Sequence, residues 1–211
     1  MVLGLWVANG KIYVWDVIFP GDSNRNELVQ ALLRRVKEAE FDVERVLFDA
    51  WYACSKTLNL VHTFHWTYVC RVKCNRLLDG ISIDSHKFLG AKGRTGRLKG
   101  VYKRVQVAKD GDRYLLTNDL IPHTSQSLSE WYGERWVVET VFRDLKSILH
   151  LEKCSCRNFT QQFNHALCAL EAFLFLQEAF PTQSVQAAQQ EFLKKYRCPN
   201  CRPDLTKLIR A

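Results

Sequence analysis

The sequence of 211 residues predicts an α/β fold. Over residues 1–75, runs of β-branched and aromatic residues alternate with helix-periodic runs in the order strand, strand, helix, strand, helix, strand. Hydrophobic residues make up 47% and charged residues 25% of the chain, which is typical of a globular protein and excludes a disordered chain. No apolar run is long enough to span a bilayer, so a membrane is not an expected partner.

The first elements are predicted from local patterns. Residues 2–8 and 12–19 are apolar and β-rich, and the Asn9-Gly10 pair between them is typical of a tight hairpin turn. Asn24 and Glu27 have the spacing of a capping box, which predicts that a helix follows. The remaining expected elements of this part are a strand over 45–49, a helix starting near 53 and a strand over 67–73.

Changes in composition and in hydrophobic periodicity along the chain predict four segments. The first part of the core is followed by a β-rich insertion with a basic loop, by two helices and by a C-terminal helix with a tail; their bounds are 1–75, 76–125, 126–180 and 181–211. The insertion contains strand candidates at 101–107 and 113–117, joined by Asp110-Gly111. A capping-box pattern at Ser127 and Glu130 predicts one long helix over 128–150. Two further helices are expected at 159–179, apolar almost all round and therefore buried, and at 184–196.

Positive charge is concentrated in one segment. The chain has 30 Lys and Arg residues against 22 Asp and Glu, a formal net charge of +8. Residues 87–109 hold eight basic residues and no acidic one, so this segment carries the whole excess, and Phe88 and Tyr102 within it are available to stack on bases. A solvated surface loop is the alternative, but the uncompensated charge favours a nucleic acid partner. The candidate DNA-binding residues are Lys87, Lys92, Arg94, Arg97, Lys99, Lys103 and Arg104.

Eight cysteines raise the question of metal binding. Because no basic segment follows Met1, no signal peptide is expected and the thiols are interpreted as reduced. Cys198 and Cys201 form the one CxxC pair, whereas Cys154 and Cys156 form a CxC pair far away in the sequence. A structural zinc site usually needs two such knuckles, so a zinc- or thiol-based protein is kept only as a third hypothesis.

Two groups of residues have the chemistry of an active site. Tyr132, Arg135, Glu139 and Lys146 are spaced to lie on one narrow stripe of a continuous helix, with a solvated stripe and an Arg135–Glu139 pair as the alternative. Asp49 follows a predicted strand, where carboxylates often bind ligands in α/β sheets. It is equally well placed to cap a following helix.

These residues carry a resemblance to a known family. The Tyr-x2-Arg-x3-Glu-x6-Lys spacing at 132–146 resembles the signature helix of bacterial insertion-sequence DDE transposases. Asp49-Ala-Trp-Tyr52 is similar to the setting of that family's second catalytic aspartate. Further similar motifs are Arg71-Val-Lys73-x-Asn75-Arg76 at a strand end and Tyr114-Leu-Leu-Thr-Asn118 before the signature helix. The four motifs occur in the family's order over most of residues 1–157.

The resemblance implies a fold and a chemistry. The fold would be a ribonuclease-H-like catalytic core with its first strand missing, a β-rich insertion and C-terminal helices. The chemistry would be DNA strand cleavage and transfer at insertion-sequence ends, with two Mg²⁺ ions held by carboxylates. Asp49 and Glu139 would be catalytic metal ligands, and Tyr132, Arg135 and Lys146 would contact DNA.

The implied partners are transposon ends and target DNA, together with a homo-oligomer or an intact transposase. The implied location is the bacterial cytoplasm, at the nucleoid.

One departure from the family bears on activity. The family's first catalytic aspartate lies on a strand that precedes the hairpin at 2–19, and this sequence starts after that strand. Asp16 would lie two strand spacings of about 4.8 Å away from it, too far for metal–oxygen bonds of about 2.0–2.6 Å, and Asp22 has the same problem. We therefore expect an N-terminally truncated transposase that binds DNA and catalyses little. A DNA-binding regulator that blocks an intact transposase is the alternative.

The missing strand also has a structural consequence. Each buried backbone group left without a partner costs about 1–3 kcal/mol, against a typical stability of about 5–15 kcal/mol. We expect the chain either to be marginally stable alone or to pair residues 2–8 with 45–49.

Overall fold

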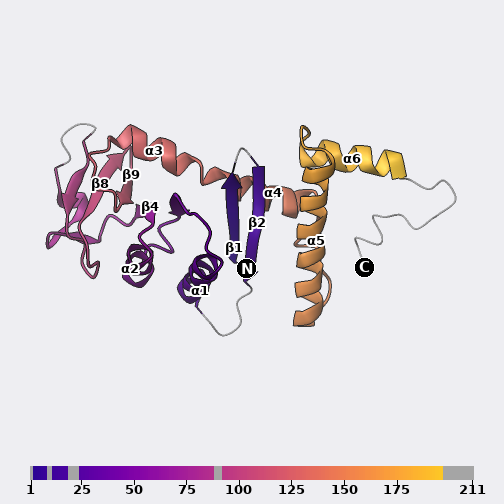
Figure 1. The fold of residues 1–211 in the computed structure, drawn as a ribbon, viewed down its shortest axis with the longest axis horizontal. Coiled ribbons are helices and arrows are strands. Elements are labelled where there is room, and N and C mark those ends of the chain that lie inside the picture. Colours follow the sequence, from indigo (N-terminus) through magenta and orange to yellow (C-terminus); the bar gives the residue numbers. More distant parts are fainter. Residues whose placement is uncertain (1, 9–10, 19–23, 88–91, 197–211) are drawn as a thin grey trace. The chain divides into compact units, whose positions relative to one another are not determined.

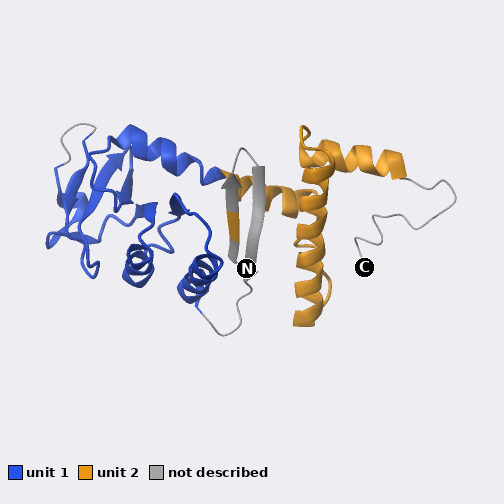
Figure 2. Ribbon diagram, in the orientation of Figure 1, with its two compact units in different colours: residues 1–2, 20–136 blue, residues 3–19, 137–211 orange. Residues whose placement is uncertain are grey.

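The computed structural model describes residues 2–8, 11–18, 24–87 and 92–196 (Figure 1). The chain divides into two compact units, which Figure 2 colours blue and orange. Unit 1 comprises residues 1–2 and 20–136, and unit 2 comprises residues 3–19 and 137–211. The division therefore falls inside the helix that the sequence predicts over 128–150.

Unit 1 is built on a mixed five-stranded sheet with the order β3-β4-β9-β8-β7. Its strands are β3 (Arg45–Phe48), β4 (Thr67–Val72), β7 (Arg94–Gly96), β8 (Val105–Asp110) and β9 (Arg113–Thr117). Only β3 and β4 are parallel; the other neighbours are antiparallel. The predicted hairpin around Asp110-Gly111 is confirmed, but it continues the sheet beyond β4 and forms no separate layer.

The helices of unit 1 cover both faces of this sheet (Figure 1). They are α1 (Arg25–Glu38), α2 (Ser55–Thr63) and α3 (Ser125–Gly133). The predicted capping box of α1 is confirmed, since Asn24 and Glu27 exchange backbone and side-chain hydrogen bonds of 3.1 Å. Successive residues of β4 point to opposite faces: Tyr68 contacts His62 of α2, whereas Val69 packs in one cluster with Leu128 of α3.

A small hairpin and a short helix follow β4. They are β5 (Leu77–Leu78), β6 (Ile81–Ser82) and the 3₁₀ helix η1 (Ile83–Ser85). Asp79 and Gly80 form the two-residue turn with φ values of 50° and 83°, as a tight hairpin turn of this kind requires. Residues 101–104, predicted as the start of a strand, instead connect to β8 without strand pairing.

Unit 2 contains a two-stranded sheet and three helices. The predicted hairpin is present as β1 (Val2–Ala8) and β2 (Lys11–Ile18), and its Asn9-Gly10 turn lies outside the described residues. The helices are α4 (Trp136–Ser147), α5 (Phe159–Ala179) and α6 (Val185–Tyr196). Their shared core contains Val141, Leu145, Leu149, Ala169, Leu170, Phe173, Leu176, Val185 and Ala188. Only one face of α5 is buried, so the expectation of burial all round is wrong.

The long helix predicted over 128–150 is also wrong, because it is two helices. Thr124, not Ser127, caps the first, since the Thr124 hydroxyl oxygen accepts the Ser127 N–H at 3.1 Å. The first helix ends at Gly133, a residue of low helix propensity. Leu128 is buried in the core of unit 1, whereas Val141 is buried in the core of unit 2, so the two halves of the segment pack in different cores.

The strand pairing expected to replace a missing strand is not formed in the described residues. There β1 pairs with β2, and β3 pairs with β4 at one edge of the five-stranded sheet. Among the described residues, no helix combines the length and the apolar composition needed to cross a membrane.

His62 makes the stability of unit 1 depend on pH. Burial and, to a lesser extent, the charge of Lys103 lower its pKa from the ordinary value of 6.5. The folded state binds a proton at His62 less tightly than the unfolded state does. The stabilising contribution of neutral His62 is therefore complete above pH 6.5 and is lost as the pH falls from there through the lowered pKa. We expect the melting temperature to fall over that range, and to fall less in His62→Leu. His65→Asn, which changes an exposed histidine with a φ of 61°, is the control and should keep the wild-type slope.

Candidate functional site

Asp49 stands where β3 ends. It opens a turn in which its carbonyl oxygen accepts the Tyr52 N–H at 3.0 Å, and its carboxylate accepts the N–H of Ala50 at 2.6 Å. Helix α2 begins six residues later and has Cys54 at its N-cap, so Asp49 is not a helix cap. Since the carboxylate bonds only to the adjacent N–H among the described contacts, it keeps oxygen lone pairs available to a ligand.

Arg76 holds the turn that follows Asp49. Its guanidinium donates to the carbonyl oxygen of Ala53 at 2.9 Å and to the hydroxyl of Ser55 at 3.2 Å. A third hydrogen bond of 3.2 Å reaches the carbonyl oxygen of Lys99. The planar fork of an arginine suits such a set of acceptors. Arg76 thus joins the turn of Asp49, the start of α2 and the basic stretch around Lys99.

Within unit 1, the charges of Asp49 and Arg135 both act on the hydroxyl of Tyr132. Burial is the main cause of a raised pKa for the Tyr132 hydroxyl, and the nearby Asp49 charge raises it further. Arg135 and Arg71 act in the opposite direction, and the Arg135 guanidinium lies 5.2 Å from the centre of the Tyr132 ring. Tyr132 is therefore a neutral phenol, and the charges of Asp49, Arg135 and Arg71 all act on its pKa.

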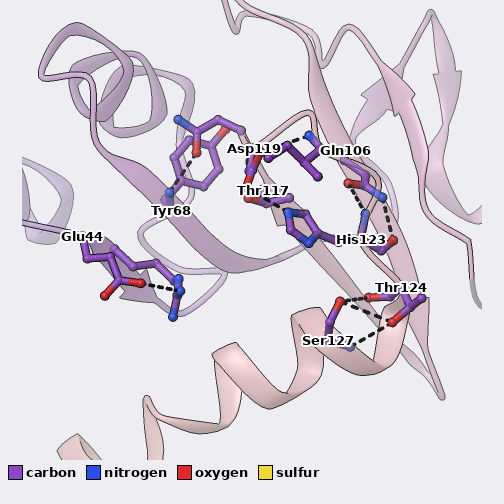
Figure 3. Close-up of polar contacts among 11 residues, drawn as sticks. Glu44, Tyr68, Gln106, Thr117, Asp119, His123, Thr124 and Ser127 are labelled. Carbon is purple, nitrogen blue, oxygen red and sulfur yellow. Dashed lines mark hydrogen bonds and ion pairs between the residues drawn. The ribbon is translucent and has the colours of Figure 1, made fainter.

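The start of α3 is fixed to the sheet by polar contacts around His123 (Figure 3). Its backbone exchanges hydrogen bonds of 2.8 and 3.3 Å with the Gln106 side chain, and its ring lies 2.9 Å from the Asp119 carboxylate. Burial raises the pKa of Asp119, but the hydrogen bonds from His123 and a backbone N–H outweigh it, so the net pKa is lowered. The ring also contacts Trp131 edge-on, which connects this network to α3.

The other two residues of the predicted stripe lie on α4. Glu139 is in the first turn of this helix and is half-buried. Lys146, in the last turn, forms an ion pair of 2.5 Å with Glu152. Because α3 and α4 are separate helices, the four residues do not lie on one continuous helix as the spacing predicted. Asp49, Tyr132 and Arg135 belong to unit 1, and Glu139 and Lys146 to unit 2.

Comparison with protein families decides the assignment. Residues 5–173 match the family model described as "Transposase DDE domain". The chain belongs to the DDE transposase family. A comparison with curated protein sequences gives no match. The resemblance inferred from the four motifs is thus confirmed at the level of the family, and a mixed α/β fold is present as expected.

The transposase family typically uses divalent metal ions, and the donors present meet this requirement only in part. Asp49 and Glu139 offer the carboxylate oxygens that Mg²⁺ prefers. Within the described ranges, however, no three histidine, cysteine or acidic side chains gather into a potential metal site. The described part of the transposase therefore provides candidate ligands but no complete set. Six cysteines in these ranges are free thiols, and Cys198 and Cys201 lie outside them.

The basic residues predicted to bind DNA lie on the surface of unit 1. All seven are exposed, and residues 88–91 of this stretch lie outside the described part. The stretch is more ordered than the flexible loop that the sequence suggested, because Arg94 is in β7 and Lys92 bridges to Thr124. This order leaves the cationic groups on the surface of the transposase.

Two features of unit 1 were missed by the sequence analysis. Trp51, two residues after Asp49, is 68% exposed, and the Lys73 ammonium lies 5.1 Å from the centre of its ring. Asn59 of α2 makes two hydrogen bonds to the backbone of the basic stretch. The motif D-x-W-Y contained Trp51, but nothing in the local sequence around Asn59 signals a partner more than 40 residues away.

Proposed function

We propose that this transposase domain binds the ends of an insertion sequence and contributes two carboxylates to a metal-dependent site for DNA strand cleavage and transfer. The observation that carries the proposal is the grouping of Asp49, Tyr132 and Arg135. The Asp49 carboxylate, which is far from Tyr132 in the sequence, acts on the buried Tyr132 phenol, and the Arg135 guanidinium lies 5.2 Å from the centre of the Tyr132 ring, all within unit 1.

The family membership and the residue chemistry support specific roles. Asp49 and Glu139 would hold Mg²⁺, two ions in an intact family site, which would supply an activated water or 3′-hydroxyl and stabilise the leaving oxygen. Arg135 is suited to bidentate contact with a phosphate, and Lys146 to a point-charge contact, for which it would have to leave Glu152. Tyr132 would complete the phosphate contacts as a hydrogen-bond donor. A ribonuclease-H-like core is the fold that we propose for the assembled site.

The polypeptide of 211 residues is proposed to bind DNA and to cleave little. Mg²⁺ keeps several waters and is usually bound by one or two carboxylates, so Asp49 and Glu139 suffice for one ion but offer few ligands to a second. A third carboxylate would complete the site.

Metal binding tests the proposal without requiring catalysis. Mg²⁺ at about ten times its dissociation constant is expected to raise the melting temperature by about 2–4 °C, because it binds the folded state. Asp49→Asn and Glu139→Gln should each reduce this shift, while Asp112→Asn, in the exposed β8–β9 turn, should retain it. An equal Mg²⁺ shift in all four proteins would refute the assigned ligands.

DNA binding and cleavage are measured on the same proteins. The wild-type chain should bind a fluorescein-labelled duplex with a dissociation constant of about 10⁻⁴–10⁻⁶ M at physiological salt, as expected for sequence-independent phosphate contacts. No binding at low salt would refute the proposed partner. Efficient Mg²⁺-dependent cleavage would refute the proposed inactivity.

A second candidate function is a regulator that occupies transposon ends and blocks an intact transposase. The exposed basic surface favours it, because DNA binding there requires no metal. Co-expression with an intact transposase of the same element should lower transposition frequency, and unchanged transposition would exclude this role.

A further inference from the structure

A fixed backbone conformation presents part of the basic stretch to solvent. In residues 97–104, Leu98 and Val101 are buried, while Arg97, Lys99, Tyr102, Lys103 and Arg104 point outward as exposed residues. This basic segment therefore has an apolar inner side and a cationic outer side, although it contains no helix or strand. Such a conformation must be specified by contacts outside the segment.

The first set of contacts comes from the β5–β6 hairpin. The Lys99 N–H donates to the carbonyl oxygen of Leu77 at 2.9 Å. Asp79 binds both backbone groups of Arg97. The Arg97 N–H donates to the Asp79 carboxylate at 2.8 Å, and the Arg97 carbonyl oxygen accepts the Asp79 N–H at 2.9 Å. Asp79 thus binds the backbone of Arg97, and the Arg97 guanidinium stays available.

The second set comes from α2. The Asn59 side-chain amide donates to the Gly100 carbonyl oxygen at 2.9 Å, and its oxygen accepts the Tyr102 N–H at 3.0 Å. Ser55 of the same helix donates to the carbonyl oxygen of Lys99 at 3.3 Å. Gly100 has a φ of 82°, and a Cβ there would lie 2.7 Å from the Ser55 hydroxyl. The turn therefore approaches α2 as closely as only glycine permits.

The outward side chains lack acidic partners. No ion pair with a described carboxylate involves Arg97, Lys99, Lys103 or Arg104. Tyr102 is 83% exposed, the largest exposure among the exposed large hydrophobic residues of the described part. Cations without acidic partners fit the phosphates of a nucleic acid, and an exposed aromatic ring beside them is suited to stack on a base where the strands are open.

We propose that Asn59 is a positioning residue that pre-forms the basic segment for DNA. The inference rests on the proposed DNA binding and adds how the contact surface is prepared. Because the two amide hydrogen bonds fix the backbone before DNA arrives, binding does not have to order the segment. Without them the competent conformation is only a fraction of the population, and the apparent affinity is reduced to that fraction of its intrinsic value.

The test compares Asn59→Ala with Thr63→Ala. Thr63 lies one turn further on α2, and its hydroxyl bonds within the helix to the Asn59 carbonyl oxygen, so it controls for a change on the helix surface. Gly100→Ala is a second variant, because its Cβ strains the same turn and crowds the Ser55 hydroxyl while Asn59 is kept. Each full-length protein is titrated against one fluorescein-labelled blunt duplex at several salt concentrations. Amide hydrogen exchange over residues 97–104 and the melting temperature are measured in parallel.

We expect Asn59→Ala and Gly100→Ala to weaken binding about tenfold, in proportion to the lost competent population. The salt dependence should stay unchanged, because the same cations reach the phosphates once the segment has ordered. Exchange over residues 97–104 should accelerate, while Thr63→Ala matches the wild type in every measurement.

Unchanged affinity in Asn59→Ala, with wild-type DNA binding intact, would overturn the positioning role alone. A general loss of melting temperature with uniform acceleration of exchange would also overturn it, since it would show a merely structural residue. No DNA binding by the wild type would overturn the proposed function and this inference together.

Discussion

Replacing Arg97, Lys99, Lys103 and Arg104 together by alanine is expected to weaken binding to duplex DNA by about a hundredfold or more at physiological salt. Each cation that neutralises a phosphate releases counterions, which contributes about 0.9 to the slope of log affinity against log salt. The slope should therefore fall by about three to four. Fluorescence anisotropy over a series of salt concentrations measures the affinity and the slope together.

A matched control separates local contacts from overall charge. Alanine at four exposed basic residues elsewhere lowers the net charge by the same amount; they are Arg34, Lys153, Arg157 and Lys194. This variant should lose little affinity, because long-range attraction is screened beyond about 8 Å at physiological ionic strength. Equal losses in both variants would show that net charge, and not the basic segment, determines DNA binding.

Arg76→Ala is expected to lower the free energy of unfolding by about 2–4 kcal/mol, since hydrogen bonds to a charged donor contribute about 1.5–3 kcal/mol each and are not additive. The variant loses three such bonds, to Ala53, Ser55 and Lys99. Arg76→Lys should recover less than half of the loss, because one ammonium on a flexible stem cannot match the planar fork. Urea unfolding, followed by a probe in unit 1, measures the difference.

Arg113→Ala is the control for Arg76→Ala, because Arg113 is an exposed arginine of the same unit at the start of β9. It should change the free energy of unfolding by less than about 0.5 kcal/mol. If Arg76→Ala were as mild as this control, Arg76 would not hold the turn after Asp49.

Arg76 and Asn59 act on the same part of the backbone by different means. Arg76 binds the Lys99 carbonyl oxygen from the residue before β5, and Asn59 binds Gly100 and Tyr102 from α2. Arg76 also binds Ala53 in the turn after Asp49, whereas Asn59 does not. A loss at Arg76 should thus disturb both the candidate metal ligand and the basic segment, and a loss at Asn59 only the segment.

Local sequence predicted the elements whose signals lie within one turn or one strand. The capping box at Asn24 and the strand before Asp49 are both present. They could be predicted because each depends on neighbours at most a few residues away. The four ordered motifs likewise identified the family, since the Asp49 and Glu139 settings are short and specific.

The sequence-based prediction was wrong for residues 128–150, because the two halves of this segment pack in two different cores. The pattern over 128–150 is compatible with a single helix, and the Tyr132–Lys146 spacing then predicts one stripe. In the structure, Leu128 is buried in unit 1 and Val141 in unit 2, with a break after Gly133. Helical periodicity cannot reveal this, because it does not specify which core each half contacts.

The sequence by itself determined the family, the α/β class and the identity of the candidate carboxylates and cations. Only the tertiary structure decided that the basic segment is ordered and which residues order it. The physical reason is the distance along the chain: Asn59 binds partners 41 and 43 residues away, and Arg76 binds Lys99 23 residues away. Such hydrogen bonds exist only after the sheet and α2 have been brought together, so no local pattern encodes them.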